Sequence, residues 1–382
     1  MDFKKSEEQE ILLESVREAI TRGNFDAYFK QCDSEHVFPE KAVNALVDIG
    51  IPSLGVPEEF GGTPVSILTQ VMVAEEAYAH GWPSLCWINF STEVDDILSF
   101  GNKQQQKTVI DYAMRGKKPF TLGFTEPQAG SDSSAMATTA TKKNGKVYIN
   151  GVKTFNTSAD RAPLMLCVAR SGINDNPYKD FSMYMFPMDS AGVSLSKLNK
   201  IGNNMCNTFE VYLDNVECDE SDLVGEECKG FYQLMKNFEV ERLTICACNV
   251  GMARCAYDEA IRYAGQREQF KTTIGSFQLI QEKLVDMKIK IENMQNMLYK
   301  TAWKKDNGLS ISIDSSLVKR YTGQAAFEVI DDAMQIMGGI GYTHECRISR
   351  LWRDQRVYRI MAGTEEIMVH TAGRALIKEA AK

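Results

Sequence analysis

A short segment rich in glycine and hydroxyl side chains, Phe124–Asp132 (FTEPQAGSD), carries groups that a polar ligand needs. The hydroxyls of Thr125 and Ser131 and the free N–H groups of a glycine-containing turn can hydrogen-bond a ligand. The same composition is typical of a tight structural turn, and the segment alone favours that interpretation. A binding function therefore depends on the other segments that the fold brings to it.

Two segments near the C-terminal end have related chemistry. Gly338–Gly341 (GGIG) follows a helical run, and glycines let the backbone approach a flat or phosphorylated ligand. Met361–Glu366 (MAGTEE) opens onto a further helix, whose N-terminus favours anions. Between them arginine recurs at every third position, at Arg347, Arg350, Arg353, Arg356 and Arg359. On one helical face they can bind carboxylates or phosphates, although most are expected to form a solvated, salt-bridged surface.

Other common catalytic motifs are missing from the sequence. No G-x-G-x-x-G, G-x-x-x-x-G-K-[ST] or G-x-S-x-G segment occurs, which argues against dinucleotide-binding, P-loop and serine-hydrolase sites of those kinds. The ten cysteines include no C-x-x-C pair, and the four histidines have no H-x-x-x-H spacing. We therefore expect no metal site, and reduced cysteines that serve as small hydrophobic residues.

The elements that must position these segments fall into three zones. Residues 1–120 have apolar residues at helical spacings of three and four. Residues 121–230 contain short β-rich runs, and NGKVYING predicts turns at Asn144–Gly145 and Asn150–Gly151. Residues 231–382 return to long helical periods typical of a bundle. The order predicts helices, then a β domain, then a helical bundle.

Composition narrows the class of protein further. The 382 residues carry a net charge of −8, which argues against general nucleic-acid binding. No apolar run reaches the roughly 18 residues of a membrane-spanning helix, and the charged N-terminal segment does not resemble a signal peptide. A cytoplasmic protein without membrane insertion is expected.

Taken together in their order along the chain, these segments resemble the acyl-CoA dehydrogenase family. The resemblance rests on T-E-P-x-A-G-S-D, on R-x-x-F at Arg267–Phe270, on Q-x-x-G-G-x-G-Y at Gln335–Tyr342 and on the final G-T-x-E-I. It implies a mainly helical fold with an N-terminal helical domain (1–120), a middle β-barrel (121–230) and a C-terminal four-helix bundle (231–382). Within the family, the chain is most similar to the crotonobetainyl-CoA reductase branch of anaerobic bacteria.

The resemblance implies FAD as cofactor, held between the β domain and the bundle. Matching positions place Phe124, Thr125 and Ser131 along the flavin, with Phe155 and Thr157 at its other edge. It further implies that four residues reach the FAD of a neighbouring subunit, which makes the protein a homo-oligomer, in this family usually a tetramer: Arg267, Phe270, Gln335 and Gly339. Thr364 and Glu366 match contacts to the nucleotide part of the cofactor.

Removal of a proton from the α-carbon of a thioester requires a carboxylate that acts as the base at that carbon. Many relatives carry it immediately before the Gly-Thr of the last motif, where this chain has Ala362. A minority place it before an arginine in the helix that opens the bundle, which corresponds here to Glu241. We predict Glu241 as the acid/base, the alternative being a purely structural pair with Arg242 or with a neighbouring helix. The resemblance also implies that the Ala362 N–H donates to the thioester carbonyl and that Ser131, Glu239 and Arg242 contact the substrate.

The predicted function is interconversion of acyl-CoA and trans-2-enoyl-CoA with an electron-transferring flavoprotein as redox partner, and net enoyl-CoA reduction is the expected direction. Three alternatives remain open: a flavin oxidase or monooxygenase, a CoA-thioester elimination on the same fold, and a non-catalytic CoA-binding protein. Trp82–Phe100 is expected near the acyl pocket, where Trp87 and Phe90 either surround a cationic acyl group or simply pack between helices. Acyl-chain identity stays open, because one methylene changes binding by only about 1–3 kcal/mol.

Overall fold

The first part of the chain is helical in the computed structural model, which describes residues 4–381. Its helices are α1 (Glu7–Gly23), α2 (Asp26–Glu35), α3 (Glu40–Asp48), α4 (Ile67–Ala79), α5 (Ser91–Phe100) and α6 (Lys103–Met114). The Ser6 side chain accepts the N–H of Gln9, whose side chain bonds back to Ser6, so α1 begins with a capping box. Helix α4 is buried along most of its length between α1 and the C-terminal helices, as its nearly continuous apolar sequence requires.

The middle of the chain forms one eight-stranded sheet. Its strands are β1 (Phe120–Gly123), β2 (Thr139–Lys143), β3 (Lys146–Thr157), β4 (Leu164–Arg170), β5 (Phe181–Pro187), β6 (Val193–Lys197), β7 (Thr208–Asp219) and β8 (Leu223–Val224). They lie in the order β6-β7-β3-β2-β4-β5-β8, with β1 parallel to β4. The predicted barrel is not closed by hydrogen bonds, because no pairing joins the end strands β6 and β8 within residues 4–381. The sheet has a hydrophobic core of its own.

One of the two predicted turns in NGKVYING is confirmed and the other is wrong. Asn144 and Gly145 both have positive φ and join β2 to β3 in a hairpin. Asn150–Gly151 instead lies inside β3, where the register against β7 shifts between Ile149 and Gly151. A Cβ atom at Gly151 would lie 2.3 Å from the Thr138 hydroxyl. This glycine therefore marks a bulge and a close backbone approach rather than a reversal of the chain.

The last part of the chain is a helical bundle. It contains α7 (Gly230–Gln266), α8 (Gln278–Asp306), α9 (Ser312–Met337), α10 (Arg347–Gln355) and α11 (Glu365–Ala380), with the short hairpin β9 (Glu268–Gln269) and β10 (Thr272–Thr273) between α7 and α8. Helix α9 packs against α7, α8, α10 and α11, while α4 from the N-terminal part packs against α7 and α8. The predicted four-helix bundle is thus present in α7, α8, α9 and α11.

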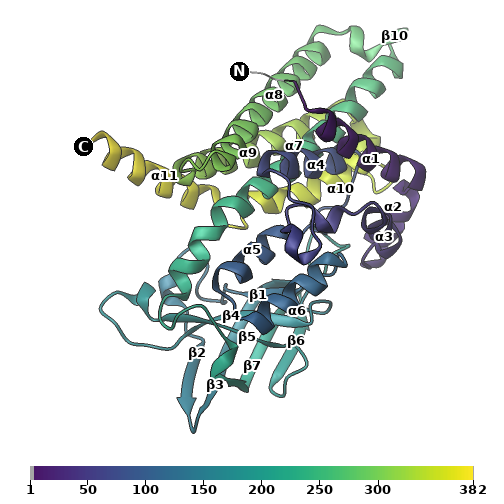
Figure 1. Cartoon of the computed structure of the whole chain (residues 1–382). Coiled ribbons are helices and arrows are strands. Elements are labelled where there is room, and N and C mark those ends of the chain that lie inside the picture. Colours follow the sequence, from purple (N-terminus) through teal and green to yellow (C-terminus); the bar gives the residue numbers. More distant parts are fainter. Residues whose placement is uncertain (1–3, 382) are drawn as a thin grey trace.

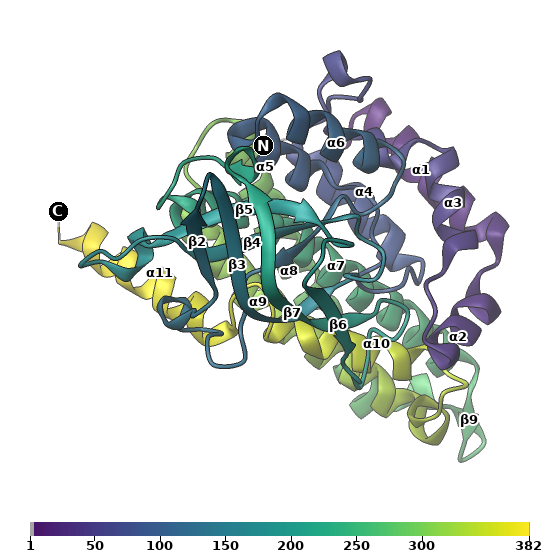
Figure 2. The same cartoon turned by 90° about the horizontal axis from the view of Figure 1, so that it is seen from below.

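The two ends of the molecule differ in secondary structure (Figure 1). The sheet lies at one end, and the β9–β10 hairpin projects from the opposite end. The view from below shows the strands crossing in front of the long C-terminal helices (Figure 2). Helix α7 has 37 residues, a length of about 55 Å. It starts beside the sheet, where it contacts β5, and ends at the hairpin.

No helix within residues 4–381 combines the length and apolar character that a membrane-spanning segment requires.

Candidate active site

Glu241 lies in the first third of α7, on the part of the helix that is only half-buried. Among residues 4–381 no hydrogen bond or ion pair holds its carboxylate, so the predicted alternative of a structural pair with Arg242 is not observed. Burial raises the pKa of Glu241 to about 7, and the nearby Glu93 carboxylate adds to this, while Lys118 and Arg242 oppose it. A carboxyl group with this pKa can both accept and donate a proton near neutral pH.

Helix α5 places further carboxyl groups opposite Glu241. Burial raises the pKa of Asp96 to about 8, with contributions from Glu93, Glu241 and Asp95. Its Oδ1 atom is buried without a hydrogen-bond partner in the described structure. Glu93 lies 3.9 Å from the Lys118 ammonium group. The segment predicted to lie near the acyl pocket therefore carries carboxyl groups whose charges interact with that of the candidate base.

The aromatic residues of this segment pack rather than surround a space. Phe90 is buried, with the Lys118 ammonium group 5.7 Å from its ring centre. Trp87 packs against Tyr78, with ring centres 6.1 Å apart. Both rings therefore have protein partners, as the simpler of the two interpretations predicts.

The loop before α11 presents an unused backbone donor. Ala362 and Gly363 have left-handed backbone conformations, with φ of 52° and 86°. The N–H of Met361 bonds to the Val357 carbonyl, but no acceptor among residues 4–381 takes the N–H of Ala362. An unpaired, half-buried N–H is suited to a ligand oxygen. Thr364 caps α11 by accepting the N–H of Ile367 on its hydroxyl oxygen, and Glu366 is exposed at the same helix start.

A buried lysine connects this loop with α7. The Nζ atom of Lys319 on α9 donates to the Gly363 carbonyl oxygen at 2.5 Å, and its charge interacts with that of Arg242. Burial lowers the pKa of Arg242, and its Nε atom is buried without an acceptor in the described structure. Arg242 and the half-buried Glu239 lie on the same turn of α7 as Glu241. The predicted base, the predicted N–H donor and the predicted CoA contacts thus belong to one region.

The predicted flavin contacts of the β domain form a second part of this region. The Thr154 N–H bonds to the Thr125 carbonyl at 2.8 Å, which joins the segment after β1 to β3. Phe124 packs against Phe238 of α7, with ring centres 6.0 Å apart. Phe155 has a positive φ of 57° and a side chain that is 67% exposed.

Three hydroxyl groups in these segments have no hydrogen-bond partner in residues 4–381, those of Thr125, Ser131 and Thr157. Unused hydroxyls beside an exposed aromatic ring fit a flat, polar ligand such as a flavin. The residues present are therefore compatible with FAD.

A buried ion pair holds the predicted flavin-binding segment in place, and sequence reasoning missed it. Lys153 of β3 is 0% exposed and its Nζ atom lies 2.7 Å from Oε1 of Glu126. Lys153 also donates to the Phe124 carbonyl at 3.3 Å. Glu126 accepts the N–H groups of Ala137 and Thr138. Burial alone would raise the pKa of Glu126, but Lys153 and the Ala137 N–H lower it below its ordinary value.

The remaining predicted cofactor residues lie elsewhere. Arg267 immediately precedes the β9–β10 hairpin, and Phe270 lies in the turn between its strands, where it is 89% exposed. Gln335 and Gly339 are exposed where α9 ends and the short 3-10 helix Gly338–Tyr342 begins. The hairpin lies at the end of the molecule opposite the sheet (Figure 1). One chain therefore does not bring Arg267 and Phe270 to its own Phe124–Ser131 segment.

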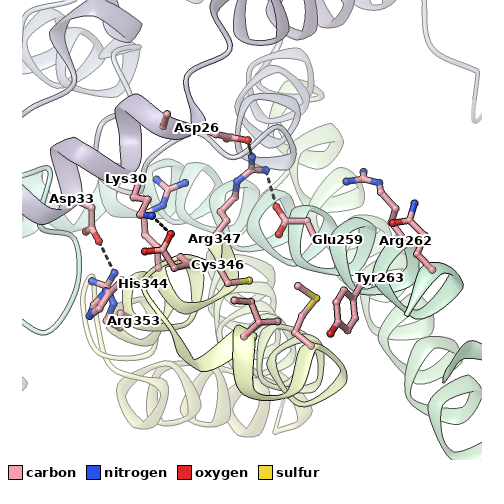
Figure 3. Close-up of a pocket in the computed structure, with 16 residues that line it drawn as sticks. Asp26, Lys30, Asp33, Glu259, Arg262, Tyr263, His344, Cys346, Arg347 and Arg353 are labelled. Atoms are coloured by element: carbon pink, nitrogen blue, oxygen red, sulfur yellow. Dashed lines mark hydrogen bonds and ion pairs between the residues drawn. The ribbon is translucent and has the colours of Figure 1, made fainter. Parts of the chain in front are cut away.

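The arginine series is largely structural. Helix α10 ends at Gln355, and Arg356–Arg359 form a 3-10 helix, so the five side chains do not share one helical face. A cavity of about 580 Å³ between α2, α7 and α10 contains three of them (Figure 3). There Arg347 pairs with Asp26 and Glu259, and Arg353 pairs with Asp33. None of the predicted site residues lines this cavity, and no group of metal-binding side chains occurs in the described part of the chain.

Comparisons with known proteins cover the same three parts of the chain. Residues 6–117, 121–216 and 228–377 match the family models for the acyl-CoA dehydrogenase N-terminal, middle and C-terminal domains. The chain is 47% identical over 380 residues to the "Probable acyl-CoA dehydrogenase YdiO" of Escherichia coli K12, covering 99% of each chain. Among solved structures, a glutaryl-coenzyme A dehydrogenase in complex with glutaryl-CoA has a TM-score of 0.92 at 28% identity, covering 99% of this chain and 97% of that one. Butyryl-CoA dehydrogenase from Megasphaera elsdenii has a TM-score of 0.90 at 27% identity, covering 99% of this chain and 100% of that one.

Proposed function

The chain belongs to the acyl-CoA dehydrogenase family, a family of flavin-dependent oxidoreductases, and on that premise we propose that it binds FAD and interconverts acyl-CoA and trans-2-enoyl-CoA. One observation carries the proposal. A half-buried carboxyl group without an ion-pair partner, Glu241, has its pKa raised to about 7 in the region where the loop of Ala362 offers a free N–H. This is the combination that proton abstraction next to a thioester carbonyl needs.

The roles of the residues follow from that arrangement. In the oxidative direction the Glu241 carboxylate removes the α-proton, and the Ala362 N–H stabilises the negative charge on the thioester oxygen. Arg242 and Glu239 bind the CoA part of the substrate. FAD, when bound, supplies the acceptor for the β-hydride. In the reductive direction the protonated Glu241 returns the proton to the α-carbon, because the same groups serve both directions.

We further propose net reduction of enoyl-CoA, with electrons supplied by an electron-transferring flavoprotein. The similarity to the crotonobetainyl-CoA reductase branch supports this direction, and the raised pKa of Glu241 is compatible with it, since a substantial fraction of the carboxyl is protonated near neutral pH. The position of Phe124 against Phe238 and the bundle favours a flavin enclosed by protein, which suits electron exchange with a protein partner rather than reaction with dissolved oxygen.

We also propose a homo-oligomer, most simply a tetramer, in which the hairpin end of one chain completes the flavin site of another. The separation of Arg267 and Phe270 from the sheet supports this. So does the apolar surface where α7 and α8 meet, on which Ile261, Leu279, Val285 and Ile289 are exposed. Exposed patches of this kind are typical of interfaces.

Replacement of Phe270 with alanine tests the shared site. We expect FAD affinity to fall by roughly 10- to 100-fold, because loss of aromatic stacking on a base costs about 1–3 kcal/mol. Flavin retained after dialysis, measured by absorbance, reports the affinity, and light scattering reports the oligomeric state. Ile173→Ala, a 98% exposed residue of the β domain, is the matched control. Equal flavin retention in the two variants would contradict a role for Phe270 in cofactor binding.

The reaction itself is tested by anaerobic visible spectroscopy of the purified protein. We expect a bound flavin that is bleached by a saturated acyl-CoA and, after dithionite reduction, reoxidised by the matching enoyl-CoA. A panel of short, branched, aryl and cationic acyl groups identifies the substrate class. A flavin indifferent to every thioester would favour the oxidase or elimination alternatives, and a protein that takes up no FAD would favour a CoA-binding protein without catalytic activity.

A further inference from the structure

Lys319 is a fully buried cation behind the loop that carries Ala362. It lies on α9 with 0% exposure, and its Nζ atom donates to the Gly363 carbonyl at 2.5 Å. Glu365 of α11 forms ion pairs with Arg359 and Arg320 and none with Lys319. No carboxylate in the described structure forms an ion pair with Lys319. Burying an ammonium group without a counter-ion is unfavourable, so its position calls for a specific role.

The loop that Lys319 contacts has a backbone that needs support. Ala362 has a positive φ of 52°, which is unfavourable for a residue with a side chain. The hydrogen bond from Lys319 fixes the carbonyl of the next residue and so restrains the peptide planes around Ala362. The Ala362 N–H, unpaired within the described residues, keeps the direction that this backbone imposes.

We propose that Lys319 is a positioning residue for thioester activation: its ammonium group holds the 361–364 loop and adds positive charge behind the Ala362 N–H where negative charge develops on the thioester oxygen. This inference rests on the proposed function. In the step it assists, the α C–H bond breaks, the proton passes to the Glu241 carboxylate, and the electron pair is delocalised onto the carbonyl oxygen. Lys319 itself transfers no proton.

The charges around Lys319 agree with this role. Arg242 and Cys246 face it from α7, and Glu365 and Glu366 face it from α11. Burial lowers the pKa of Lys319 to about 8, with Cys246, Glu365 and Glu366 opposing this and Arg242 reinforcing it. The ammonium form therefore predominates at neutral pH, where Glu241 is partly ionised. A preorganised charge in a site that excludes water acts more strongly than one in solvent.

The experiment separates the charge of Lys319 from its hydrogen bond. Lys319→Met removes both, whereas Lys319→Gln keeps a donor for the Gly363 carbonyl and removes the charge. The probe is a saturated acyl-CoA whose β-carbon is replaced by sulfur, which can lose an α-proton but cannot give up a β-hydride. Its α-hydrogen exchange in D2O is measured by mass spectrometry on the flavin-loaded protein, and its affinity by equilibrium dialysis. Lys304→Met, which breaks the pair with Asp314 elsewhere in the bundle, is the control.

We expect exchange to slow by about 100-fold in Lys319→Met, the size of effect seen when one oxyanion-stabilising group is removed, and by a smaller factor in Lys319→Gln, which keeps a donor for the loop. Probe affinity in Lys319→Gln should stay close to that of the wild type, and Lys304→Met should exchange at the wild-type rate. In the wild type, exchange should rise as Glu241 ionises near pH 7 and fall above about pH 8 as Lys319 loses its proton. That pH dependence tests the inference without any variant, should the substitutions prevent folding.

The outcomes distinguish this inference from the function on which it rests. Wild-type protein that exchanges no α-hydrogen would overturn the proposed function and, with it, the role of Lys319. Wild-type protein that exchanges, together with variants that exchange equally fast or an exchange rate that does not fall above pH 8, would overturn the role of Lys319 alone.

Discussion

Glu241→Gln is expected to lower turnover by about 10³- to 10⁴-fold, since general acid–base catalysis contributes up to this much. Glutamine preserves the size of the side chain but can neither accept the α-proton nor return it. Flavin content should be unchanged, because the predicted flavin contacts lie on other segments. Steady-state kinetics with an artificial electron acceptor and the absorbance of the purified variant measure the two effects.

The control for this substitution is Asp258→Asn, which removes an exposed carboxylate from the same helix. It should leave turnover close to that of the wild type. Turnover retained in Glu241→Gln would exclude Glu241 as the base and direct attention to Asp96, whose pKa is also raised.

The pH dependence of the wild type provides a second check on Glu241. Oxidation needs the carboxylate, so kcat/KM for a saturated acyl-CoA should rise with pH through about 7. Reduction needs the protonated acid, so kcat/KM for an enoyl-CoA should fall over the same range. Both changes should disappear in the residual activity of Glu241→Gln.

Lys153→Met is expected to give the largest loss of stability, about 3–5 kcal/mol, because it leaves the buried Glu126 carboxylate without its cation. The segment from Phe124 to Thr138 would lose its restraint at both ends, so flavin binding should weaken as well. Thermal unfolding of the flavin-free protein measures the first effect, and flavin retention measures the second.

An exposed ion pair on the same strand serves as the control for Lys153. Lys146 pairs with Glu217 and Asp219 at the surface of the sheet. Lys146→Met should therefore change the melting temperature little, since exposed pairs contribute little. The double variant Lys153→Met/Glu126→Gln should recover part of the loss, because it removes both charges. A Lys153→Met protein as stable as Lys146→Met would contradict the importance of the buried pair.

The order of helices, sheet and bundle was predictable from hydrophobic periodicity, because each period repeats over many residues. Glu241 could be proposed as the base from the sequence once Ala362 had removed the alternative position. Lys153 and Lys319 were not, because a lysine in a strand or helix is normally assigned to the surface. Their neighbours gave a signal: Ser315, Val318, Thr322 and Ala326, all buried, share one face of α9 with Lys319.

Tertiary contacts decided the features that local patterns could not. Asn150–Gly151 has the composition of a turn, yet the approach of Thr138 places it inside β3. The arginines at every third position suggested a single face, but the helix ends after Gln355. Arg347, Arg353 and Arg359 pair with different carboxylates, and Arg350 donates to the Gly81 carbonyl. The placement of Arg267 and Phe270 at the far end of the molecule follows from the length of α7, which no local motif encodes.

The separation of Glu241 from the hairpin has a genetic consequence. In a two-fold pair of chains, each site would take its base from one gene product and its Phe270 from the other. When a Glu241→Gln chain pairs with a Phe270→Ala chain, one site contains both substitutions and the other contains neither. Two alleles that are each defective alone would therefore complement one another partially when expressed in the same cell.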